Sequence, residues 1–159
     1  MGRSSFLLSW ARIAALALAA AGPASAAGEG LSAVEQRLVA RVEANRGRAI
    51  DLLRRAVDQP SATENLAGVR KVGALFAAEL AELGFATRWV ELSPAMGRAG
   101  HLVAESGVAA GGSGPRILMI GHLDTVLEGE PFRREGARAY GSGASDMKGG
   151  DVVIVEALR

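Results

Sequence analysis

The chain has 159 residues, and 18 Lys and Arg against 17 Asp and Glu give it a formal net charge of +1. This balance excludes the basic excess typical of a nucleic-acid-binding protein, and 49% hydrophobic residues exclude a disordered chain. Cysteine is absent, which excludes a disulfide framework, a Cys-ligated zinc, a thiol nucleophile and the lipid-modified cysteine of a bacterial lipoprotein. The length allows about one domain.

Residues 1–26 are predicted to be a cleaved signal peptide. Arg3 and Arg12 give a positive start, the run 13–21 is apolar, and a proline followed by an Ala-Ser-Ala cleavage site ends the segment. The alternative is a membrane anchor, but the nine residues at 13–21 are fewer than the roughly 20 that a spanning helix needs. We therefore expect a secreted or periplasmic protein with no stable membrane anchor, whose mature part is 27–159.

Two helices are predicted at the start of the mature chain. Apolar residues recur every three or four positions over 31–57, and Gly47 is expected to break or kink this helix. A second apolar stripe covers 66–83, and either Thr63 or Asn65 is expected to cap its first turn.

The rest of the chain alternates short strands with a further helix. Strands are expected at 85–92, 101–104 and 116–121, a small hairpin at 132–140, and a helix from residue 147 onward. The run Ile117–Ile120 is apolar at every position, which is typical of a central strand buried on both faces. Helices that alternate with short strands indicate an α/β layer fold.

His122 and Asp124 directly follow the predicted central strand. Open α/β sheets bind ligands at the carboxyl ends of their strands, and residues two apart in an extended chain point to one face. The histidine could offer one ring nitrogen to a metal while the aspartate holds the other. The alternative is that His122 is a hydrogen-bonded rim residue and that Asp124 caps a turn.

A glycine-rich segment at 141–150 contains the second candidate, Asp146. Glycine-rich loops before helices can cradle phosphate, but this segment lacks the Walker pattern, so a nucleotide site is not expected. Asp146 could simply cap the following helix, or it could be a carboxylate that bridges two metal ions.

Together these motifs resemble the co-catalytic zinc metallopeptidase family of glutamate carboxypeptidase, acetylornithine deacetylase and succinyl-diaminopimelate desuccinylase. The resemblance runs from Ala49 to Arg159. It rests on Gly121-His122-Leu123-Asp124-Thr125-Val126 and Ser145-Asp146-Met147-Lys148-Gly149-Gly150, supported by the upstream segments 60–69 and 83–85.

The resemblance implies a role for each candidate residue. His122 would be a terminal ligand of one Zn²⁺, Asp146 would bridge two Zn²⁺ ions, and Asp124 would bind no metal but orient His122 as part of the catalytic site. It also implies a cis peptide bond between Asp146 and Met147, and a three-layer sandwich with a mixed sheet.

The family's remaining site residues have no counterpart in this sequence. The resemblance implies a Glu-Glu pair that supplies the general base and a late histidine, but the sequence has no Glu-Glu pair and His101 precedes the site. We interpret Glu156 as a helix surface residue and Asp151 as a first-turn helix acid. We therefore expect 27–159 to be the N-terminal part of the catalytic domain, inactive alone and weak in zinc binding.

The implied function is that of a secreted zinc-dependent metallopeptidase or amidohydrolase similar to glutamate carboxypeptidase. It would cleave a C-terminal amino acid or an N-acyl amino acid amide bond, and its partner would be a small peptide or N-acyl amino acid rather than nucleic acid. A homodimer is expected only of a full-length protein. Two alternatives remain open, namely the related two-zinc aminopeptidases and a non-catalytic secreted binding module derived from the same fold.

Overall fold

The computed structural model describes residues 30–106 and 115–159. The signal peptide predicted at 1–26 lies outside the described residues. The chain divides into two units, Met1–Arg37 and Leu38–Arg159, and the described part of the first is the beginning of a helix. None of the helices in the described ranges is both long enough and apolar enough to cross a membrane.

Helix α2 (Ala33–Asp58) is continuous through Gly47, so the predicted break does not occur there, and the alternative of a kink stays a prediction. A glycine within a helix costs only about 1 kcal/mol relative to alanine. The last turns of α2 place Leu52 and Val57 in the core, and this burial offsets the cost.

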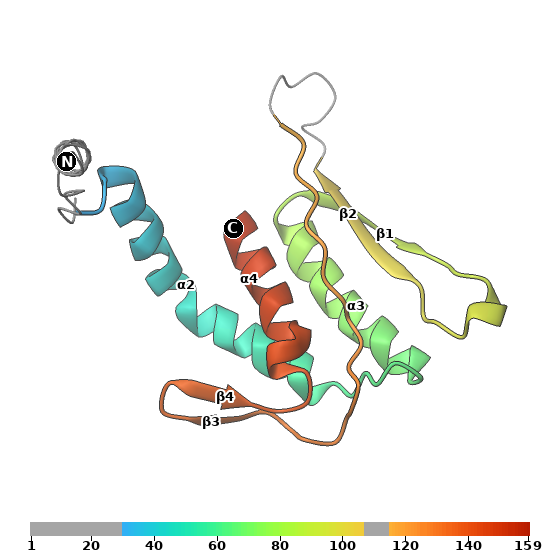
Figure 1. The fold of residues 1–159 in the computed structure, drawn as a ribbon. Helices are drawn as coiled ribbons and strands as arrows, with labels where there is room; N and C mark the ends of the chain where they lie inside the picture. The colour runs from blue at the N-terminus through green and yellow to red at the C-terminus, as the bar shows by residue number, and fades with distance from the viewer. Residues whose placement is uncertain (1–29, 107–114) are drawn as a thin grey trace, which may run out of the picture. The chain divides into compact units, whose positions relative to one another are not determined.

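Helix α3 (Leu66–Glu82) begins where its N-cap was predicted. The Asn65 side chain accepts a hydrogen bond from the Gly68 amide at 3.0 Å, which identifies Asn65 rather than Thr63 as the cap. The helix packs on a two-stranded antiparallel sheet of β1 (Phe85–Val90) and β2 (His101–Ser106), as Figure 1 shows.

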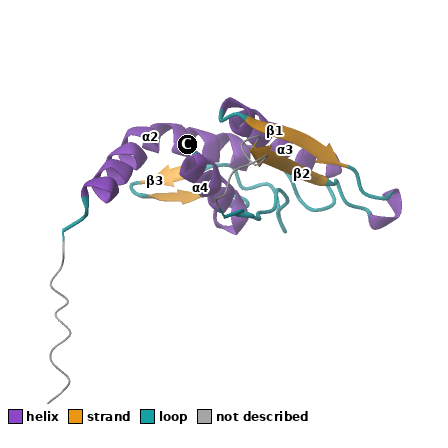
Figure 2. Ribbon diagram, turned by 90° about the horizontal axis from the view of Figure 1, so that it is seen from above, coloured by secondary structure: helices purple, strands orange, loops and turns teal. Residues whose placement is uncertain are grey.

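A short 3-10 helix, η1 (Pro94–Met96), lies in the connection between β1 and β2. A second antiparallel pair, β3 (Arg133–Glu135) and β4 (Arg138–Tyr140), forms the predicted small hairpin, drawn as a separate pair of arrows in Figure 2. The chain then enters a kinked π-type turn, η3 (Ala144–Lys148), which leads into helix α4 (Gly149–Leu158).

The hydrophobic core joins the three helices. Its buried members come from α2, α3 and α4, and they are Leu52, Ala56, Val72, Phe76, Val152 and Val155. An ionic cluster reinforces this helical layer. Glu79 of α3, 5% exposed, lies 2.6 Å from Arg55 and 2.9 Å from both Arg48 and Arg159.

The central strand predicted at 116–121 is not formed. The segment is irregular, and the side chains of Ile117, Leu118 and Ile120 are between 76% and 84% exposed. A strand requires a neighbour that pairs with its amides and carbonyls, and no described segment pairs with this one. The apolar pattern of this run indicates that its side chains favour burial, but it does not determine which strand would pair with it.

The described residues therefore form a mixed helix-and-strand structure with two small sheets, in line with the predicted α/β class. The three-layer sandwich around a mixed sheet stays a prediction, because both sheets of the described ranges are two-stranded and antiparallel.

Candidate metal centre

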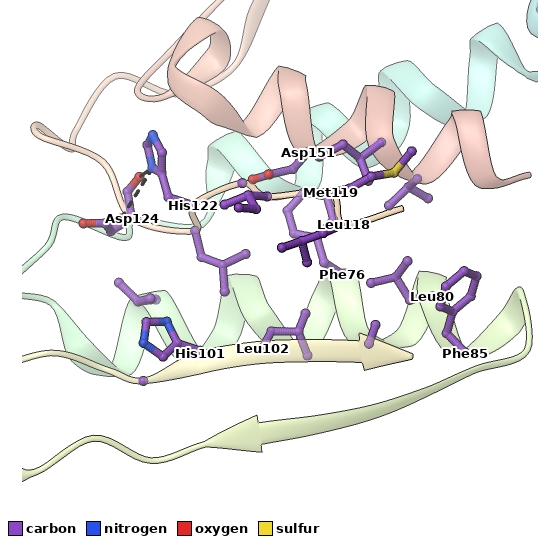
Figure 3. Close-up of a pocket in the computed structure, with 18 of the residues that line it drawn as sticks. Phe76, Leu80, Phe85, His101, Leu102, Leu118, Met119, His122, Asp124 and Asp151 are labelled. Atoms are coloured by element: carbon purple, nitrogen blue, oxygen red, sulfur yellow. Dashed lines mark hydrogen bonds and ion pairs between the residues drawn. The ribbon is translucent and has the colours of Figure 1, made fainter. Parts of the chain in front are cut away.

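The His122 ring lies between two aspartates. On one side, Nε2 is 2.9 Å from Oδ1 of Asp146. On the other side, Nδ1 is 2.9 Å from the backbone carbonyl of Asp124 and 3.4 Å from its carboxylate oxygen Oδ1. Figure 3 shows the contact between His122 and Asp124. The structure thus brings together all three residues that the sequence singled out.

These contacts assign the ring nitrogens different roles. The Asp124 carbonyl can only accept, so Nδ1 carries a hydrogen and donates it. Nε2 then faces the Asp146 carboxylate, which is also an acceptor. Two acceptors at this distance require a positive centre between them, either a proton on Nε2 or a metal ion. An imidazole nitrogen and a carboxylate oxygen are both common zinc ligands, so this pair fits Zn²⁺.

The acidity of His122 reflects the same contacts. Burial alone would lower its pKa, but the hydrogen bonds to Asp146 and to the Asp124 carbonyl, together with both negative charges, raise the pKa above its ordinary value. The protonated form of the His122 ring is therefore favoured by this site.

The two carboxylates cannot serve one ion together, because the His122 ring separates them. Asp146 is on the Nε2 side and Asp124 is on the Nδ1 side. Across the described ranges there is no group of three or more His, Cys, Asp or Glu that could hold a metal ion. The arrangement places a ring nitrogen and a carboxylate oxygen, both of zinc-ligand type, on one side, and the Asp124 carboxylate on the other.

The turn η3 determines where Asp146 points. Asp146 and Met147 have non-helical backbone angles within this turn, and the peptide bond between them is cis, as the resemblance implies. The next residue, Lys148, is fully buried, and its Nζ donates to the carbonyl of Gln59 at 3.0 Å. This bond ties the turn to the loop before α3 and makes Lys148 a structural anchor of the site.

A cavity of about 990 Å³ adjoins His122 and Asp124. Figure 3 shows these two residues toward one end of it and Leu80 with Phe85 toward the other. Its walls are mainly apolar side chains from α3, β2, α4 and the exposed run 117–120. The main chain of that run lacks strand partners in the described structure, so the cavity also borders unpaired amides and carbonyls.

Asp151 lines this cavity, and its sequence position did not identify it as a site residue. It is a first-turn acid of α4, as predicted, yet it is only 8% exposed and its Oδ2 has no hydrogen-bond partner. Burial raises its pKa to about 6, although the charges of His122 and Lys148 act in the opposite direction. A side chain at Gly121 would place its Cβ 2.0 Å from Asp151 Oδ1, so the Asp151 carboxyl packs directly against this glycine and would have to move.

Glu156 also differs from its predicted place on the helix surface. Its side chain is 15% exposed, and Oε1 lies 3.4 Å from Nε of Arg159. The helical pattern of α4 contains acids on two faces, and burial depends on what packs against each face rather than on the pattern itself.

Comparison with known proteins gives two informative matches, although no family model matches the chain. Carboxypeptidase G2 from Pseudomonas sp. (strain RS-16) is 34% identical over 117 residues, which are 69% of this chain and 27% of that protein. Succinyl-diaminopimelate desuccinylase from Verminephrobacter eiseniae (strain EF01-2) is 33% identical over 130 residues, which are 70% of this chain and 31% of that protein.

The chain spans less than a third of the length of these two curated relatives. Both matches nevertheless take up more than two thirds of this chain. The chain belongs to the family that contains carboxypeptidase G2 and succinyl-diaminopimelate desuccinylase.

Proposed function

We propose that this chain carries the N-terminal part of the catalytic domain of an exported zinc-dependent hydrolase. The whole protein would cleave a C-terminal amino acid or an N-acyl amino acid amide bond, similar to glutamate carboxypeptidase. The observation that supports this proposal is the His122 ring held by Asp124 at Nδ1 and turned with Nε2 toward Asp146. Residues 1–26 would direct export and be removed.

His122 and Asp146 are the residues that would hold zinc. When bound, zinc polarises a scissile carbonyl and activates a water. The chain's own contribution is positional. Asp124 fixes the ring so that Nε2 remains available, and the turn η3 aims the Asp146 carboxylate at the same point. In the complete site Asp146 would bridge two zinc ions.

Zinc binding tests the first half of this proposal. Isothermal titration of the full chain with Zn²⁺ should show binding that is weak compared with a complete enzyme, because each catalytic zinc normally has three protein ligands. The variant H122N should lose this binding. The variant H101N is the matched control, since His101 is the other histidine of the chain and contacts neither aspartate. Equal binding by H122N and the parent chain would contradict the assignment.

Hydrolysis tests the second half. The purified 159-residue chain, supplied with zinc, should not turn over folate-like or N-acyl-glutamate substrates, because the general base and further ligands expected of the family are missing from its sequence. Turnover at ordinary enzyme rates would refute this expectation. Reading the gene beyond the codon for Arg159 would show whether a Glu-Glu pair and a late histidine follow.

A non-catalytic secreted binding module is the second candidate. The small number of ligands at the site supports it, because two converging ligands are fewer than a catalytic zinc requires. Zinc-independent binding of an N-acyl amino acid by both the parent chain and H122N would favour this module over the hydrolase.

A further inference from the structure

The loop before α3 pairs with the segment that follows His122. The Thr63 amide donates to the Thr125 carbonyl at 3.0 Å, and the Thr125 amide donates to the Ser61 carbonyl at 2.9 Å. Residues Ala62 and Thr125 thereby form a parallel bridge. This pairing brings a loop 61 positions away in the sequence against the candidate metal centre.

Glu128 adds side-chain hydrogen bonds to this junction between the loop before α3 and the segment after His122. Its Oε2 accepts from the Ala62 amide at 2.8 Å and from the Asn65 side chain at 3.2 Å. The pKa of Glu128 is lowered by the hydrogen bond from the Ala62 amide and by that from Asn65, so the carboxylate is charged at neutral pH. The loop is therefore fixed at two points by its backbone and at a third by an ionised side chain.

Within this junction, one side chain reaches the site. Oγ1 of Thr63 donates to Oδ2 of Asp124 at 2.6 Å. The other carboxylate oxygen, Oδ1, is the one that lies 3.4 Å from Nδ1 of His122. One hydrogen bond thus determines how the carboxylate is rotated toward the ring.

The Thr63 hydroxyl has no competing structural task of similar quality. The helix cap is made by Asn65, so the hydroxyl is not needed at the start of α3. Its other acceptor, the Thr125 carbonyl, is farther away at 3.4 Å. The short, charge-assisted bond to Asp124 is its principal interaction.

We propose that Thr63 is a positioning residue for His122 and acts through Asp124. This proposal rests on the proposed metal centre. Its hydroxyl holds the Asp124 carboxylate beside Nδ1, which stabilises the tautomer with hydrogen on Nδ1 and keeps Nε2 free for zinc. Without the hydroxyl the carboxylate can rotate, and only the Asp124 carbonyl still holds the ring. Outer partners of metal ligands typically contribute 10–100-fold in metal affinity.

Zinc affinity gives the first measurement. By isothermal titration of the full chain, T63V should bind Zn²⁺ about tenfold more weakly, and T63S should stay close to the parent because it keeps the hydroxyl. T125V is the matched control, since it removes a neighbouring hydroxyl that bonds the Leu127 carbonyl and not Asp124. Unchanged affinity in T63V, or an equal loss in T63S, would overturn the proposal.

A double-mutant cycle separates positioning from general structure. In a D124N background the T63V substitution should cause no further loss of zinc affinity, because the charged acceptor is gone. A second full loss in this background would show that Thr63 acts by another route and would overturn the proposal. Should T63V fail to fold, T63A removes the same hydroxyl and is read by the same cycle.

The ring tautomer gives a measurement that needs no metal. Nitrogen-15 spectra of the metal-free chain at about pH 9, where the imidazole is neutral, should show His122 with hydrogen on Nδ1, and T63V should shift the population toward Nε2. If the parent chain binds no zinc but T63V still shifts the tautomer, the metal assignment fails and the positioning role stands. An unshifted tautomer in T63V contradicts the positioning role whatever the chain does with zinc.

Discussion

Apolar side chains in two parts of the molecule end in opposite environments. In the helical layer, Leu52 and Val72 are fully buried, whereas Leu118 in the run before His122 is 84% exposed. The helices satisfy their own backbone hydrogen bonds and need only each other's side chains, but an extended segment needs neighbouring strands as well. The candidate metal centre lies between these two environments, since the segment before His122 is unpaired in the described residues and the segment after it is paired to the loop before α3.

The largest expected effect comes from the same substitution made in each part. L52A should lower the free energy of unfolding by about 2–5 kcal/mol, because it leaves a cavity in the core. L118A should change it by less than about 0.5 kcal/mol, because that side chain is already exposed. Urea unfolding of both variants measures the contrast. A costly L118A would mean that the run 117–120 is buried in solution.

The ionic cluster of the helical layer should come next. E79Q removes the negative charge that lies against Arg48, Arg55 and Arg159, and we expect a loss of about 2 kcal/mol at pH 7. Burial tends to raise the pKa of Glu79, but its arginine partners lower it below 4.5 overall. The stabilisation is therefore present above about pH 4.5 and lost as the pH falls through the lowered value.

Urea unfolding of E79Q and the parent at pH 7 and near pH 3 provides the check. The difference between them should shrink at the acidic pH. E82Q is the matched control, because Glu82 contacts Arg48 from an exposed position. An equal loss in both variants would show that burial of Glu79 adds nothing.

Removing the charge of Asp151 should have the opposite effect on stability to removing that of Glu79. The pKa of Asp151 is raised to about 6, so ionisation of this carboxyl above that pH destabilises the folded state. D151N should therefore stabilise the chain by about 1–2 kcal/mol at pH 7, and the gain should vanish near pH 4, where the parent carboxyl is already neutral. Thermal unfolding at the two pH values measures this, and a destabilised D151N at pH 7 would contradict it.

Among the charged side chains, the smallest effect is expected where Glu128 meets the loop before α3. E128Q keeps the acceptor oxygen for Ala62 and Asn65 but removes its charge, so stability should fall by less than it does in E79Q. Urea unfolding gives the value, and E130Q, on an exposed residue nearby, should leave stability unchanged. If E128Q lost more stability than E79Q, the contacts of Glu128 would stabilise the chain more than the ionic cluster around Glu79 does.

Local patterns predicted most of the helices and strands. The helix at 66–83, the strands after it and the hairpin at 132–140 follow from spacing, caps and turn residues that act over a few positions. Gly47 was overestimated as a breaker because packing at Leu52 and Val57 outweighs a single glycine. The strand at 116–121 failed because pairing is not a property of the segment alone.

The candidate site divides in the same way. His122, Asp124 and Asp146 carry a motif that the sequence shows, and the structure brings them together. The parts played by Thr63 and Asp151 could not be predicted. The first depends on a contact 61 positions away, and the second depends on which face of α4 lies over Gly121. A threonine two residues before a capped helix start is too common to point to a site.

The bridge between Ala62 and Thr125 also bears on the order of folding. A contact this remote along the chain closes only after a large loop has lost its freedom, whereas α3 and the β1–β2 hairpin form from near neighbours inside that loop. The geometry around His122 should thus be among the last parts of the chain to form, and a nascent chain would carry His122 and Asp146, the candidate metal ligands, unassembled until the intervening helix and hairpin are complete.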